Sequence, residues 1–220
     1  MFDFSFFFGL FPIMFRYLDV TLGISVAALA LSLLIALVIA AADYLKIPIL
    51  RPFCKGWVSL FRGTPLLAQL FWLCYGLPQL IVPLQKVSTM TLIVFGVAFN
   101  ASSYMAETLR GAISSVGKGQ MEACLACGMS GGKGLLRIVL PQAIRVAVPG
   151  LSNNFVDIIK QSSLAFTLGV TEIMAVAKME GATNLKFLES FTAVMILYWL
   201  VVTFFNYVQK LLERRLAKMY

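Results

Sequence analysis

The amino-acid sequence predicts an all-α integral membrane protein with five membrane-spanning helices, and its composition and apolar patterning support that prediction. The chain has 220 residues, of which 60% are hydrophobic and only 13% are charged, and its mean hydropathy is +0.88. A soluble domain carries roughly 25% charged residues. Several apolar stretches reach the roughly 20 residues that a helix needs to cross a bilayer. Helices are the expected spanning elements because each satisfies its own backbone hydrogen bonds.

The predicted spans follow one another along the chain; four are apolar stretches, and a fifth is more broken by polar residues. They cover about residues 20–42, 57–82, 89–110, 138–160 and 188–209. The phenylalanine-rich segment before the first span lacks the basic region and the small-residue cleavage site of a secretory signal. We therefore expect its aromatic rings to lie at the membrane interface. The whole chain, 1–220, is predicted to form one transmembrane domain.

The distribution of basic residues predicts the orientation, because cytoplasmic loops carry an excess of Lys and Arg. Basic residues gather after the first span, between the third and fourth spans, and in the tail: Lys46, Arg51, Lys55, Arg62, Arg110, Lys118, Lys133, Arg137, Lys210, Arg214, Arg215 and Lys218. On the other side, basic residues are fewer or are balanced by acidic ones. We expect the N-terminus outside and the C-terminus in the cytoplasm. The net charge of +8 then reflects the basic residues of the cytoplasmic loops, and no nucleic-acid partner is implied.

The most unusual segment is MEACLACGMSGGKGLLRIVLP, residues 121–141. A phosphate-binding Walker A loop needs Gly five residues before its Gly-Lys pair and Ser or Thr after it, but Cys127 and Gly134 occupy these positions. Cys124 and Cys127 have redox-motif spacing without the βαβ context of such motifs. Structural zinc takes four ligands, and the chain has no histidine. The sequence therefore predicts no cofactor bound by this chain.

What remains is a loop that contains a short helix. Gly128 is suited to end this helix in a left-handed conformation, and Ser130 can cap a second helical turn. The helix carries small residues such as Ala123 and Cys124 rather than charges. Such a helix suits insertion into a cleft of a partner protein, or it lies on the membrane surface; the residue pattern leaves both interpretations open.

The same segment resembles the EAA motif of ABC-importer membrane subunits, which has Glu-Ala-Ala, then Gly, then Ile-x-Leu-Pro. The chain has Glu122-Ala123-Cys124, Gly128 and IVLP at 138–141, with every spacing kept and Cys in place of the third Ala. Three more stretches resemble the polar amino-acid branch of these permeases: FRGTPLL at 61–67, AETLRG at 106–111 and KQSSL at 160–164. The resemblance covers essentially the whole chain.

The resemblance implies the transmembrane-domain fold of type I ABC importers and a permease that is not itself an enzyme. It implies that the loop at about 114–136 is a coupling helix in a groove of a cytoplasmic ATPase dimer, which binds ATP and Mg²⁺. The implied coupling residues are Gln120, Glu122, Ala123, Cys124, Gly128, Met129 and Ser130. It also implies a second permease subunit, an external solute-binding protein, a polar amino-acid substrate (cystine importers look similar) and a bacterial inner membrane as the surrounding bilayer.

Polar residues form stripes on two predicted spans. An ionised side chain at the bilayer centre costs roughly 2.5–3.5 kcal/mol on insertion scales, so such groups should pair or line water. Glu107 and Arg110, three residues apart on one helix face, are predicted to form a structural ion pair. The candidate substrate-path residues are Asn100, Ser103, Asn153, Asp157, Lys160, Gln161, Ser162 and Ser163. Hydrogen bonds between helices are the structural alternative. Family members often carry an acid at the position of Gln161, so a cation-binding role does not carry over to it.

The resemblance thus predicts the permease of an ATP-driven, binding-protein-dependent importer of polar amino acids. The alternative is a secondary transporter driven by an ion gradient. Such carriers often contain inverted internal repeats, which this sequence lacks, and five spans are few for a complete carrier. A membrane scaffold without transport activity would leave the polar stripes unexplained.

Overall fold

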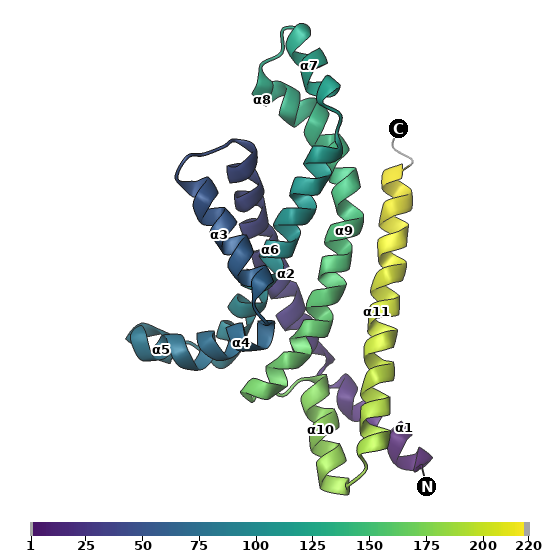
Figure 1. Ribbon diagram of the computed structural model, residues 1–220. Helices are drawn as coiled ribbons and strands as arrows, with labels where there is room; N and C mark the ends of the chain where they lie inside the picture. Colours follow the sequence, from purple (N-terminus) through teal and green to yellow (C-terminus); the bar gives the residue numbers. More distant parts are fainter. Residues whose placement is uncertain (1, 218–220) are drawn as a thin grey trace.

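A computed structural model of the chain describes residues 2–217, which form helices joined by short turns (Figure 1). Its centre is the pair α2 (Leu18–Tyr44) and α6 (Thr89–Ser115), which pack along each other. Helix α9 (Leu140–Gln161) packs on both, and α11 (Phe187–Ala217) lies beside α9. The all-α prediction is confirmed for the described residues.

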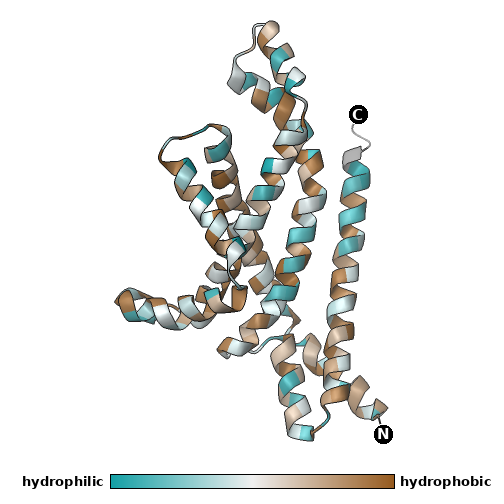
Figure 2. Ribbon diagram, in the orientation of Figure 1, coloured by the Kyte–Doolittle hydropathy of each residue, from teal (hydrophilic) through white to brown (hydrophobic). Residues whose placement is uncertain are grey.

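Four helical segments are long and apolar enough to cross a membrane, and they correspond to four of the five predicted spans. They are Leu18–Tyr44, Thr89–Ser115, Gly131–Leu168 and Phe187–Arg215. Figure 2 shows that α2 is mostly hydrophobic along its length, whereas the C-terminal end of α11 becomes hydrophilic. A helix leaving the bilayer core shows this change, since its last turns meet headgroups and water.

The stretch predicted as the second span, 57–82, is not one helix. Helix α3 (Leu50–Gly63) ends before Pro65. A second helical stretch then runs across the direction of α3 (Figure 1), and it consists of α4 (Leu66–Phe71), the π-helical turn η1 (Trp72–Gly76) and α5 (Leu77–Leu80). The break follows from a proline. Pro65 has no amide N–H and disfavours helical backbone at the residue before it, and Thr64 is extended, with φ −126° and ψ 149°.

Side-chain amides replace the backbone hydrogen bonds lost at this break. Nε2 of Gln69 donates to the backbone oxygens of Phe61 and Thr64, both at 3.0 Å. Nδ2 of Asn100, on α6, donates to the same Phe61 oxygen and to Oε1 of Gln69, again at 3.0 Å. Inside a membrane an unsatisfied carbonyl is costly. Asn100 therefore holds α3 and α4 to α6 through these hydrogen bonds.

The phenylalanine-rich segment predicted to lie at the interface forms α1 (Phe4–Phe15), which packs on α10 (Ile173–Asn184) and on the start of α11. Phe7, Leu10 and Met14 are buried there, in a second apolar core separate from the one around α2 and α6. Polar contacts also hold this segment against the start of α11. Nζ of Lys186 lies 2.6 Å from Asp3 Oδ2, and the Asp3 amide donates a hydrogen bond to Glu189.

The two ends of the molecule differ in what they carry. The loop helices α7 (Lys118–Ala126) and α8 (Gly131–Gly134) lie at the same end as the α2–α3 turn and the end of α11, while α1 and α10 lie at the other (Figure 1). Three short segments complete the chain: η2 (Val82–Lys86), η3 (Leu135–Val139) and η4 (Ser162–Leu168). Most of the basic residues used to predict the cytoplasmic side share the α7 end; Lys218 lies outside the described residues.

Candidate functional site

A cavity of about 250 Å³ between α6 and α9 brings together polar side chains of both helices. It is lined by Ala101, Tyr104, Asn154, Asp157 and Gln161. Asp157 and Gln161 belong to the predicted substrate path, and Tyr104 and Asn154 do not. A signal for Asn154 existed, because 154, 157 and 161 follow the spacing of three and four that places residues on one helix face.

Helices α6 and α9 pack closely beside this cavity. A Cβ atom added at Gly150 would lie 2.6 Å from Cγ2 of Thr108, so a larger residue would require Thr108 or the helices to move. One turn further along, Nδ2 of Asn154 donates to Oγ1 of Thr108 at 3.2 Å. A small residue and an interhelical hydrogen bond are common contacts between membrane helices. Thr108 thus fixes the position of Asn154 at the cavity.

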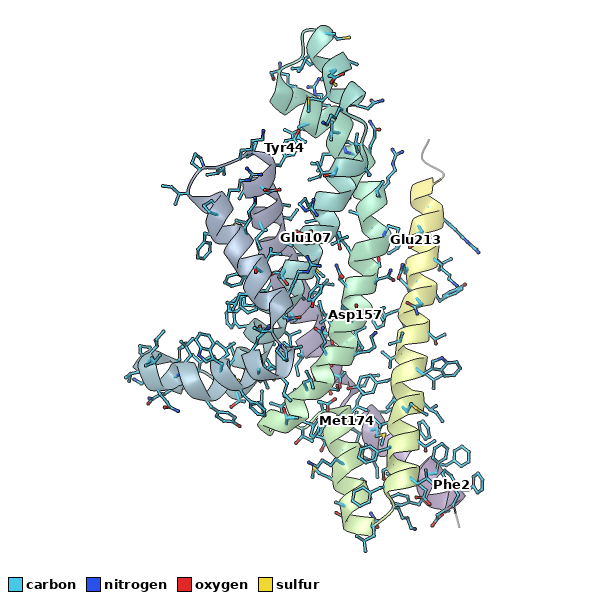
Figure 3. The ribbon with its side chains drawn as sticks, in the orientation of Figure 1. Phe2, Tyr44, Glu107, Asp157, Met174 and Glu213 are labelled. Carbon is cyan, nitrogen blue, oxygen red and sulfur yellow. The ribbon has the colours of Figure 1, made fainter. Side chains whose placement is uncertain are left out.

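The charge around the cavity comes from α9. Asp157 Oδ1 lies 2.7 Å from Nζ of Lys160 (Asp157 is labelled in Figure 3). Both side chains are more than half exposed, so a ligand can reach them from outside the chain. Oε1 of Gln161 is buried and has no hydrogen-bond partner among the described residues. A buried acceptor without a donor is destabilising by about 1–3 kcal/mol.

The other predicted path residues lie elsewhere. Asn100 and Ser103 are buried, and Ser103 Oγ donates to the Asn100 backbone oxygen at 2.6 Å. Ser162 and Ser163 donate to backbone oxygens three residues earlier in the chain. Asn153 is exposed on α9 and does not line the cavity. The structure therefore groups Asp157, Lys160 and Gln161 near the end of α9 and separates them from the polar stripe of α6.

The acidic side chain of the α6 stripe contacts two arginines. Nη2 of Arg110 lies 2.6 Å from Glu107 Oε2, and Nη1 of Arg62, on α3, lies 3.8 Å from the same oxygen (Figure 3 labels Glu107). The guanidinium of Arg62 also lies over the Tyr104 ring, 5.5 Å from its centroid. Arg62 therefore links the end of α3 both to Glu107 and to the edge of the polar cavity.

The loop between α6 and α9 is built as its residues indicate. Helix α7 ends at a Schellman motif, in which Met129 N donates to the Cys124 oxygen at 2.9 Å and Gly128 N to the Leu125 oxygen at 3.0 Å. Gly128 has a φ of +76°, the left-handed conformation expected of it. Ser130 caps α8 by accepting from the Lys133 amide. The motif's residues therefore form two short helices with a sharp, fixed turn between them.

The loop divides its residues between an inner and an outer face. Cys124, which stands in place of an alanine, is buried, and a Cβ atom added at Gly134 would lie 3.0 Å from its Cβ. A small side chain is thus required where α7 meets α8. The outer face carries the exposed residues Gln120, Glu122, Ala123, Gly128 and Ser130, whereas Met129 is partly buried. The turn presents most of the predicted coupling residues on its surface.

A bundle of apolar helices with a polar cavity beside α9, and a helix pair projecting at one end, is consistent with a membrane transport subunit. The family follows from comparison of the sequence with known families. Residues 13–218 match the family described as "Binding-protein-dependent transport system inner membrane component". The chain belongs to this family and is a permease subunit of an ATP-driven importer of the ABC class. The predicted family and transport class are confirmed.

Individual relatives match over nearly the whole chain. The protein named "Probable amino-acid ABC transporter permease protein PatM" of Vibrio harveyi is 43% identical, over 100% of this chain and 98% of its own length. The L-cystine transport system permease protein TcyB of Bacillus subtilis (strain 168) is 36% identical, over 94% of this chain and 88% of its own length. A crystal structure of an amino acid ABC transporter with histidines superimposes with a TM-score of 0.90 at 27% identity, covering 98% of this chain and 99% of that one.

Proposed function

We propose that this chain is the membrane-spanning permease of a polar amino-acid importer in a bacterial inner membrane. A cytoplasmic ATPase dimer binds ATP and Mg²⁺ and hydrolyses the nucleotide, and an external solute-binding protein delivers the substrate. The relatives named for amino-acid and L-cystine transport support this substrate class. One chain has few helices for enclosing a pore, so a second permease subunit, identical or homologous, completes the path.

The cavity between α6 and α9 is the proposed point of contact with the substrate. The observation that carries this proposal is the cavity in which polar side chains of α6 and α9 come together, namely Tyr104, Asn154, Asp157 and Gln161. An α-amino acid brings an ammonium group, which donates hydrogen bonds, and a carboxylate, which accepts them. Asp157 would accept from the ammonium, and Lys160 would face the carboxylate. Ser163 follows them in sequence, in the short segment η4.

Replacing Asp157 by alanine is expected to raise the substrate concentration that gives half-maximal uptake by about tenfold, because one charge-assisted hydrogen bond contributes about 1.5–3 kcal/mol. The measurement is ATP-driven uptake into proteoliposomes that contain the assembled permease, its ATPase and the binding protein. The matched control is Asp19→Ala, which removes a carboxylate from the exposed start of α2. Unchanged uptake by the Asp157→Ala transporter would remove this side chain from the path.

The loop of α7 and α8 is the proposed handle through which the ATPase moves these helices. ATP binding would close the ATPase dimer and draw together the two loops of a permease pair, and the helix bundles would then change from inward to outward opening. Such a cycle is a two-state equilibrium, which ATP shifts because it binds better to one state. The close, hydrogen-bonded contact of α6 with α9 supports this proposal, since a loop rigidly joined to both helices transmits its displacement to them.

A further inference from the structure

A second polar cavity, of about 460 Å³, lies where the end of α2, the start of α3 and the last turns of α6 meet. It is separate from the cavity between α6 and α9, with which it shares no lining residue. Its charged walls come from Asp43 in the last turn of α2, from Arg51 and Lys55 in the first turns of α3, and from Glu107 and Arg110 of α6. Ends of membrane-spanning helices lie at the level of the lipid headgroups.

Helix α3 presents a polar stripe to this cavity. Arg51, Lys55 and Ser59 follow one another at intervals of four and all line it. Arg51 Nε is 2.8 Å from Asp43 Oδ1, and Arg110 is paired with Glu107. Lys55 is exposed and forms no ion pair with any of the residues that the structure describes. The walls therefore carry three cations against two anions, and the unmatched charge is the ammonium of Lys55.

The remaining walls are apolar, and the opposite face of α3 is apolar as well. Ile39 and Val58 line the cavity. On the outside of α3, Phe53 is 66% exposed and Leu60 is 58% exposed. A free inorganic anion would make no use of these surfaces. A ligand with an anionic head and apolar chains would satisfy both the unmatched ammonium and the apolar walls.

We propose that this cavity binds the headgroup of an anionic phospholipid. The phosphate lies between Lys55 and Arg51, the Ser59 hydroxyl donates to a phosphate oxygen, and the acyl chains leave along the apolar wall that contains Val58. Basic pockets between membrane helices are known receptors for acidic lipid head groups. A bound lipid would contact α2, α3 and α6 together, and it would thereby stabilise their packing just before the break at Thr64.

The test is native mass spectrometry of the intact transporter, the permease with its ATPase, titrated in detergent with phosphatidylglycerol or with phosphatidylcholine. We expect preferential retention of phosphatidylglycerol. One basic residue contributes about 1 kcal/mol to binding an anionic lipid surface, so Lys55→Gln should weaken phosphatidylglycerol binding about fivefold, and the charge reversal Lys55→Glu roughly thirtyfold. Lys55→Arg should keep it, because the charge remains.

The matched control is Lys210→Gln, which removes an exposed lysine at the same end of the molecule, on α11 and outside the cavity. Its binding of phosphatidylglycerol should equal that of the unchanged transporter. The proposal is overturned if the two lipids bind equally, or if Lys210→Gln weakens binding as much as Lys55→Gln does. It is also overturned if millimolar inorganic phosphate displaces phosphatidylglycerol, because the site would then bind free phosphate.

Discussion

A transporter carrying valine in place of Gly128 is expected to lose most of its ATP-driven uptake while its membrane helices stay folded. Gly128 has a φ of +76°, and the left-handed region costs an L-residue about 1–2 kcal/mol, with β-branched side chains at the upper end. A shift of this size corresponds to a roughly 5- to 30-fold loss of the correctly shaped turn. The measurement is uptake and nucleotide hydrolysis by the reconstituted complex, with co-purification of the ATPase.

Asparagine at the same position provides the control, because it is the non-glycine residue that best tolerates left-handed backbone. Gly128→Asn should retain clearly more uptake than Gly128→Val, although asparagine is the more polar of the two side chains. No heavy atom lies within 4 Å of a Cβ built at this position, so side-chain crowding within the chain cannot explain a difference. Full uptake by the valine variant, or equal loss in both, would show that the turn does not transmit the motion.

The length of each apolar run was enough to predict most of the membrane helices. Helices α2, α6, α9 and α11 all fall within or around predicted spans, because lipid permits few alternatives to a long helix. The break between α3 and α4 went unpredicted, although its signal is local. Thr64-Pro65 is a dipeptide that ends helices. A hydropathy average over about 20 residues does not register a single dipeptide, so it indicates one continuous apolar stretch.

The candidate path shows a different limit of the sequence. Helical spacing correctly put Asn100 and Ser103 on a common face of α6, but it could not identify what that face meets. The partner of Asn100 is the carbonyl of Phe61, freed by the break in another helix. On α9, by contrast, the exposed ion pair of Asp157 and Lys160 needs only neighbouring positions on one helix, and the sequence could predict those.

Glu172 is a second case in which the fold, rather than the local sequence, determines the environment. It follows the short segment η4 and caps α10, and its side chain is fully buried. Its oxygens accept from the Ala175 amide at 3.0 Å and from the hydroxyls of Tyr198 at 2.8 Å and Thr21 at 3.4 Å. Thr21 is 151 positions away in the chain. No nearby residue in the sequence distinguishes this carboxyl from a surface glutamate.

Replacing Glu172 by alanine is expected to destabilise the protein by about 2–4 kcal/mol, because it leaves buried donors without an acceptor and removes a helix cap. The contact of α10 with α2 and α11 should loosen first, since the Glu172 side chain is hydrogen-bonded to Thr21 of α2 and to Tyr198 of α11. The measurement is thermal unfolding of the purified transporter. Glu180→Ala, which removes an exposed carboxylate of α10 that accepts a hydrogen bond from Asn184, should leave the unfolding temperature nearly unchanged.

The same carboxyl should make stability depend on pH. Burial raises the pKa of Glu172, and hydrogen bonds from the backbone and from Tyr198 offset only part of that rise. A carboxyl with a raised folded-state pKa stabilises the protein most below its ordinary pKa of 4.5, and this contribution is lost as the pH rises through the raised value. The unfolding temperature should therefore fall across that interval. Glu172→Gln keeps the shape without the ionisation and should flatten the decline; an unchanged slope would mean that another group titrates.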